Sequence, residues 1–216
     1  MKNNTNKIDT ENQSDPTPTN QYVQLRKLYR EGVNLIEHGD LYSGILILKS
    51  IVLQQPDNID AIGELTKALL ICCKDETALP YAQRWTTLRP CESMPWAALS
   101  TALYGLNRHA EAREALDKAI LVNSTDWLSL NRMAGVAAFL KYRLPEAEQL
   151  IRNALKLQPD MQTNWYVLGC VLKEQGKKIE SMLCLFRAFQ MNHNPSMSED
   201  CVDMITKMGT PDFSQN

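Results

Sequence analysis

Small and large apolar residues recur along the chain at a spacing of 34 or 35 residues. The pattern is clearest when residues are counted from five starting points, namely Leu25, Ile59, Ser93, Leu128 and Gln162. In every segment the eighth position is Gly, Ser or Thr, the twentieth is Gly, Ala or Ser, and the twenty-fourth is apolar. Because two helices approach closely only where a side chain is small, each segment predicts a pair of antiparallel helices.

Prolines mark the ends of three of these segments. Pro56 and Pro90 lie 34 residues apart, and Pro159 keeps the spacing if one extra residue is placed near Trp127. Pro80 lies inside the expected second helix of the second segment, where it removes a hydrogen bond and clashes with the preceding turn. We therefore expect that helix to kink or to begin late.

Other residues mark helix ends. Gly39 and Gly176 are each placed to end the first helix of a pair, because glycine readily adopts the left-handed backbone found after a helix. The stretch after the fifth segment begins with a capping box from Ser196 to Glu199 and ends at Gly209. It predicts one further helix with an apolar stripe.

The spacing resembles that of the tetratricopeptide repeat, a 34-residue helix pair with W-x2-L-G-x2-Y, A-x3-F and P marks. The best matches are Trp165-x2-Leu168-Gly169-x2-Leu172 and Ala147-x3-Ile151, which leads to Pro159. The resemblance implies an all-α fold, a right-handed α-solenoid of about five helix pairs plus a C-terminal capping helix that covers the last repeat. On this view Trp165 is a core residue.

The expected organisation follows from these boundaries. Residues 1–20 are rich in Asn, Thr, Gln and Pro with one aliphatic residue, Ile8, and predict a disordered polar tail or, alternatively, a docking peptide. The array is expected over 21–195, with repeats 25–58, 59–92, 93–127, 128–161 and 162–195. The capping helix is expected over 196–209, and residues 210–216 form a second disordered tail.

Composition narrows the possible partners. The chain has 216 residues, 44% of them hydrophobic, and a formal net charge of −2. This balance gives no general attraction to nucleic acid or to an anionic membrane. The sequence lacks a run of about 18 apolar residues and the apolar core of a signal peptide. We expect no nucleic-acid partner, no membrane insertion and a cytoplasmic location.

The sequence offers no constellation for catalysis or metal binding. The six cysteines include no C-x-x-C pair, and the three histidines are isolated from other ligands. An alternative role for the adjacent cysteines Cys72 and Cys73 is that of a redox switch. Nucleophile elbows, phosphate loops and H-E-x-x-H motifs are absent. The prediction is a noncatalytic protein that holds no metal and no cofactor.

In this repeat family the first helices line a concave groove, and the resemblance carries that role over to particular residues. The predicted groove residues are Tyr29, Val33, Lys67, Tyr104, Arg132, Val136, Phe139, Tyr166 and Lys173. The four aromatic residues are the predicted anchors, because aromatic residues at the centre of an interface tend to dominate binding. Phe139 has an alternative role as a core residue.

The predicted groove is more apolar than charged, which favours one class of partner. Chaperone-binding members of the family hold a peptide carboxylate with Lys and Asn residues, but here Tyr29, Val33 and Glu64 occupy three of those positions. The sequence instead predicts a scaffold, an adaptor or a client-holding chaperone that binds an apolar peptide or helix. The alternatives are a self-associating structural subunit, with a possible homodimer, and a protein similar to bacterial secretion chaperones.

Overall fold

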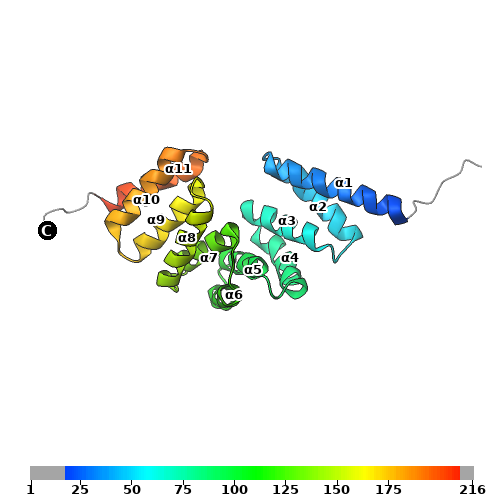
Figure 1. The fold of residues 1–216 in the computed structure, drawn as a ribbon, viewed down its shortest axis with the longest axis horizontal. Coiled ribbons are helices and arrows are strands. Elements are labelled where there is room, and N and C mark those ends of the chain that lie inside the picture. Colours follow the sequence, from blue (N-terminus) through cyan, green and yellow to red (C-terminus); the bar gives the residue numbers. More distant parts are fainter. Residues whose placement is uncertain (1–17, 210–216) are drawn as a thin grey trace, which may run out of the picture. The chain divides into compact units, whose positions relative to one another are not determined.

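The computed structural model describes residues 18–209, and this part of the chain is all-α, with eleven helices and no strand (Figure 1). The expected fold class is confirmed. The helices are α1 (Pro18–Glu37), α2 (Leu41–Gln54), α3 (Ile59–Ile71), α4 (Asp75–Leu88), α5 (Ser93–Gly105), α6 (His109–Val122), α7 (Trp127–Phe139), α8 (Leu144–Leu157), α9 (Gln162–Glu174), α10 (Lys178–Met191) and α11 (Pro195–Met208).

The helices belong to two compact units, of which the first contains α1 and α2. Gly32 and Gly44 allow these two helices to cross closely. A Cβ atom added to Gly44 would lie 2.8 Å from the carbonyl oxygen of Gly32 and 2.5 Å from Cγ1 of Ile36. No residue larger than glycine therefore fits at position 44 without moving a helix.

The second unit contains α3 to α11 and repeats one arrangement. Each odd-numbered helix from α3 to α9 packs against the helix that follows it, and α3, α5, α7 and α9 also contact one another in sequence order. These four first helices form one layer, and the second helices α4, α6, α8 and α10 form the other. The surface of the first layer is the candidate groove.

Two serine hydroxyls hold first and second helices together where they cross. Ser100 Oγ on α5 donates to the carbonyl oxygen of Ala112 on α6, at 2.7 Å. Ser181 Oγ on α10 donates to the carbonyl oxygen of Gly169 on α9, also at 2.7 Å. These residues occupy the eighth and twentieth repeat positions, and contacts this short require the small side chains found there.

The extra residue of the fourth repeat lies after α7 and not near Trp127. First helices begin at 59, 93, 127 and 162, and the loop between α7 and α8 spans 140–143, whereas the other helix pairs have three-residue loops. Lys141 and Arg143 in this loop have left-handed backbones, with φ of 50° and 49°. Each residue of α7 therefore sits one repeat position later than the sequence pattern predicted.

The N-terminus of α7 explains this register. The side chain of Asp126 accepts hydrogen bonds from the backbone N–H groups of Leu128 and Ser129, at 3.4 and 2.8 Å. An aspartate that bonds the first free N–H groups of a helix fixes where the helix begins. Trp127 is thus the first helical residue, and Leu128 is the second.

Two helix starts differ from the sequence prediction. α1 begins at Pro18, so residues 18–20 are helical and not part of a disordered tail; proline is well suited to a first helical position because it has no N–H that would need a partner there. The predicted tails at 1–17 and 210–216 lie outside the described residues. α11 is capped by Asn194, whose side chain accepts from the N–H of Met197 at 3.2 Å, so Ser196 does not begin the helix.

The expectation for α4 was wrong in one respect. The helix begins at Asp75 and runs through Pro80 to Leu88, without a late start. Its inner face buries Ala78, Ala82 and Trp85, and this burial holds the helix together across the hydrogen bond that proline lacks. The predicted ends at Gly39 and Gly176 are confirmed by φ values of 90° and 78°.

α11 covers the end of the last repeat, as expected for a capping helix. Its Cys201 is buried with Leu185 and Ala188 of α10. Gln162 of α9 is 3% exposed; its Nε2 donates to the carbonyl oxygen of Ala188 at 3.0 Å, and its Oε1 accepts from the N–H of Asn194 at 2.7 Å. One buried amide therefore ties α9, α10 and the start of α11 together.

Candidate functional site

The predicted groove residues fall on both compact units. Tyr29 and Val33 lie on α1, where they share a shallow recess of about 830 Å³ with Arg30 and Glu37. The other seven residues lie in the second unit, on α3, α5, α7 and α9. The predicted groove is therefore divided between two units, and most of it belongs to the second.

Tyr104 of α5 and Phe139 of α7 form a stacked aromatic pair on neighbouring first helices. Their ring centroids are 5.4 Å apart and their planes differ by 16°. Tyr104 also contacts the ring of His109, at 5.5 Å between centroids. Phe139 is 54% exposed, which places it on the surface and not in the core. Tyr104 is partly buried against the main hydrophobic cluster, so the pair is a preformed aromatic platform in which Phe139 is the part open to solvent.

Arg132 lies on α7 two helical turns before Phe139. It is partly buried, and its Nε atom is enclosed without a hydrogen-bond partner in the described part of the chain. Burial lowers the pKa of Arg132, and the negative charge of Asp126 opposes that effect only in part. The carboxylate of Asp126 is already bonded to donors of α7, including the hydroxyl of Ser129 at 2.7 Å.

Val136, by contrast, is a core residue. It is 4% exposed and belongs to the main hydrophobic cluster of the second unit, so it offers no surface to a ligand. The shifted register accounts for this, because Val136 takes the repeat position that Ala102 and Val171 occupy on the neighbouring first helices. Both of those residues are also buried.

Tyr166 is half-buried and is in part a packing residue. Its ring packs against the cluster formed by Leu185, Ala188 and Cys201, next to α11. Burial raises the pKa of the Tyr166 hydroxyl, and the nearby Cys170 thiol raises it further. Burial likewise raises the pKa of Cys170 to about 11, so this thiol stays protonated at neutral pH.

The two predicted lysines have acidic neighbours. Lys67 Nζ lies 2.7 Å from Glu64 Oε1 on the same helix, and Lys173 Nζ lies 3.9 Å from Glu174 Oε1. Lys67 also lines a recess of about 460 Å³ beside the loops that precede α5 and α7, with Met94 among the lining residues. Neither lysine contacts another predicted groove residue through these pairs, whereas the rings of Tyr104 and Phe139 contact each other directly.

An exposed apolar stripe on α10 was missed from the sequence. Its members, spaced by three or four residues, are Ile179, Leu183, Phe186 and Phe189. The rings of Phe186 and Phe189 lie 6.4 Å apart, and Phe189 also lines a recess of about 450 Å³ next to α11. The helical spacing of these residues was visible in the sequence, but it is equally the pattern of a buried helix face.

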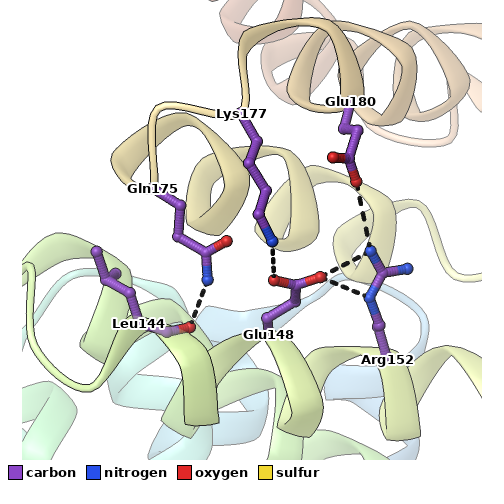
Figure 2. A network of polar contacts seen from close by, with 6 residues as sticks. All are labelled: Leu144, Glu148, Arg152, Gln175, Lys177 and Glu180. Atoms are coloured by element: carbon purple, nitrogen blue, oxygen red, sulfur yellow. Dashed lines mark hydrogen bonds and ion pairs between the residues drawn. The ribbon is translucent and has the colours of Figure 1, made fainter.

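A polar network connects α8 with α10 (Figure 2). Glu148 accepts from Lys177 Nζ at 2.7 Å and from Arg152 Nε at 2.9 Å, and Arg152 also lies 3.7 Å from Glu180. The hydrogen bond from Lys177 is the largest of the effects that lower the pKa of Glu148. Because its carboxylate is held by two cations, Glu148 serves packing between helices and is poorly placed to act as a base.

Residues 18–209 contain neither a candidate metal site nor a candidate membrane span. No group of three or more His, Cys, Asp or Glu side chains there is arranged to hold a metal ion. Within the same residues, no helix is both long enough and apolar enough to span a membrane.

Comparisons with known proteins agree with the fold. A family model of the tetratricopeptide repeat matches residues 95–126. A search of curated proteins found no match. TTC0263, a thermophilic TPR protein of Thermus thermophilus, is 18% identical over 84% of this chain and 99% of its own, with a TM-score of 0.68.

Two other solved structures are similar at lower identity. YrrB, described as a TPR protein with an unusual peptide-binding site, is 12% identical over 88% of this chain and all of its own, with a TM-score of 0.52. Human IFIT1, solved as a dimer with PPP-AAAA, is 14% identical over 85% of this chain but 45% of its own, with a TM-score of 0.71. One stretch of the chain, residues 95–126, thus matches a model of the tetratricopeptide repeat, and the described helices share the fold of these solved tetratricopeptide-repeat proteins.

Proposed function

We propose that the protein is a noncatalytic adaptor or client-holding chaperone that binds an apolar segment of a protein partner on its first-helix layer. The tetratricopeptide-repeat fold supports a scaffold for protein–protein interaction in general. The observation that carries the finer proposal is the stacked pair of Tyr104 and Phe139, which leaves more than half of the Phe139 side chain in water. A partner that covers this surface gains the free energy of burying it.

The peptide-binding site named for YrrB is consistent with this mode of binding. An extended strand or a short helix with its own apolar side chains suits such a surface. We further propose a cytoplasmic location and no dependence on a metal or cofactor.

The test replaces Tyr104 and Phe139 together with Glu. Partners captured from a lysate of the source cell by the wild-type protein are identified by mass spectrometry, and each is then assayed with the double variant. We expect capture to be lost while the far-ultraviolet circular dichroism stays near that of the wild type. Retained capture would show that the first-helix surface is not the binding site.

The chain offers a matched control. Phe186 on α10 is 51% exposed and stacks with another ring, as Phe139 does, but it lies on a second helix. Phe186→Glu should leave capture unchanged. If Phe186→Glu abolishes capture and the double variant does not, the binding surface is α10.

Self-association is the second candidate, and the exposed stripe on α10 favours it. Ile179, Leu183 and Phe186 lie on one side of the helix, and Val202 of α11 is exposed as well. Sedimentation velocity of the wild type and of Phe186→Glu separates the candidates. A dimer that dissociates in Phe186→Glu would support the structural-subunit alternative.

A further inference from the structure

The first helices α5, α7 and α9 carry very little charge. α5 has no Asp, Glu, Lys or Arg, and Arg132 is the only such residue on α7. α9 has two, Lys173 and Glu174, at its C-terminal end. Glu174 is already paired with Lys141, at 3.0 Å. Arg132 is therefore the only charged residue on α7, and the neighbouring first helix α5 carries none.

This arginine lacks the partners that a desolvated cation normally has. Nε of Arg132 is enclosed without a hydrogen bond to the described part of the protein. The nearest acidic influence is Asp126, whose carboxylate is bonded to the N-terminus of α7. Removing a charge from water without pairing it is costly, and an arginine does not avoid the cost by losing its proton. The folded protein thus keeps an unpaired positive charge in this layer.

Arg132 lies on the same face of α7 as Phe139, one member of the aromatic pair. Arg132 and Phe139 are seven residues apart on one helix, which places them on the same face, roughly 10 Å apart along the axis. Phe139 in turn stacks on Tyr104. A segment that lies along this face meets a cation at one end and an aromatic platform at the other.

We infer that Arg132 pairs with the carboxylate of an Asp or Glu side chain of the bound segment, and so selects apolar segments that contain one acidic residue. The guanidinium presents donors in a planar fork that matches a carboxylate. In an extended peptide, the distance to Phe139 corresponds to an acidic residue about two to four residues from an apolar anchor. The inference rests on the proposed function, because it specifies the partner of the same surface.

The test uses the full-length protein and a display library of short random peptides. The peptides are fused to the display protein through their C-terminal ends, so that no terminal carboxylate is available. We expect the wild type to enrich peptides with an aromatic or aliphatic residue and an Asp or Glu at a constant spacing. Arg132→Met should enrich apolar peptides without the acidic preference, while Arg187→Met, which changes an exposed arginine on α10, should behave as the wild type does.

Synthetic peptides then measure the pairing directly. For a selected peptide, changing its acidic residue to the amide should weaken binding to the wild type by roughly 30-fold. The same change should alter binding to Arg132→Met by less than about threefold, since the partner is gone. Arg132→Lys should retain part of the preference, because it keeps the charge and loses the fork.

Thermal unfolding provides a readout that does not depend on a ligand. If Arg132 serves binding, Arg132→Met removes an unpaired charge and should leave the midpoint unchanged or raise it. A lower midpoint would assign Arg132 to packing and overturn the inference.

The outcomes separate the inference from the proposed function. Enrichment of apolar peptides without an acidic preference, an acidic preference that persists in Arg132→Met, or binding only to peptides with a free C-terminal carboxylate would overturn the inference alone. Failure of the wild type to enrich any peptide, or enrichment that survives in the Tyr104 and Phe139 double variant, would count against the proposed function itself.

Discussion

At the scale of single residues, glycines on neighbouring first helices have different surroundings. A Cβ atom added to Gly169 of α9 would lie 2.7 Å from Cγ of Leu185, which is fully buried and cannot move aside freely. A Cβ atom added to Gly135 of α7 would have its nearest neighbour, Cγ2 of Val167, at 3.9 Å. Close helix packing therefore requires glycine at 169 and not at 135.

This difference predicts opposite effects of one substitution. Gly169→Ala should lower the free energy of unfolding by about 1–3 kcal/mol, because α10 must shift to admit the methyl group. Gly135→Ala should raise it by up to about 1 kcal/mol, because alanine is the better helix former and the space is open. Urea unfolding followed by circular dichroism measures both values. Equal effects of the two substitutions would contradict the packing described here.

Gly169 and Gly135 also show which packing contacts the sequence pattern predicted correctly and which it did not. The small residues at the eighth position were recognised correctly as contact points in most repeats, but in the fourth repeat Ala134 holds that place and Gly135 does not. Proline spacing alone did not reveal whether the extra residue precedes or follows α7. The left-handed residue Arg143, which has no counterpart in the three-residue loops, is not a residue type that signals a loop of this kind.

At the scale of helices, the network around Glu148 is a connection between repeats four and five. Lys177 and Arg152 hold its carboxylate in the charged form, so its pKa in the folded protein is lowered from the ordinary value of 4.5. A lowered folded-state pKa means that the stabilisation is present above pH 4.5 and is lost as the pH falls through the lower, folded value. The network should therefore help to stabilise the packing of repeats four and five at neutral pH and lose that contribution in acid.

The variant Glu148→Gln tests this pH dependence. At pH 7 it should cost up to about 1 kcal/mol, since the side chains of both cations are nearly half exposed. Below the folded-state pKa the difference from the wild type should disappear, because Glu148 is then protonated too. Chemical unfolding at a series of pH values measures the difference. Asp203→Asn, which breaks the exposed pair with Lys207 on α11, is the control and should have little effect at any pH.

Helix positions were more predictable than helix surfaces. Three first helices of the second unit begin at the predicted residues 59, 93 and 162, because each repeats the same small and large apolar positions. The sequence did not distinguish the buried Val136 from the exposed Phe139, since a one-residue slip turns a helix by about 100°. The stacking of Tyr104 on Phe139 depends on that register, and only the structure shows it.

At the scale of the molecule, a repeat protein is stabilised mainly by contacts between neighbours, and its ends are the weakest points. In the second unit α11 closes the C-terminal end. It buries Cys201 against Leu185 and Ala188, and it supplies the partners of the buried amide of Gln162 at Asn194 and Ser198. Removing α11 would expose an apolar surface and leave part of that amide without a partner.

We therefore expect a chain that ends after Met191 to lose protection against amide hydrogen exchange in α9 and α10. Both helices would then lie at an uncovered end, whereas α3 to α6 keep their neighbours and should retain their protection. A chain that ends after Gly209 keeps α11 and serves as the control, with exchange like that of the full chain throughout these helices. If the shorter chain protects α9 and α10 as well as the control does, α11 is dispensable for the array. A uniform loss from α3 to α10 would instead show that the helices of this unit unfold as one cooperative body, and that α11 stabilises all of them.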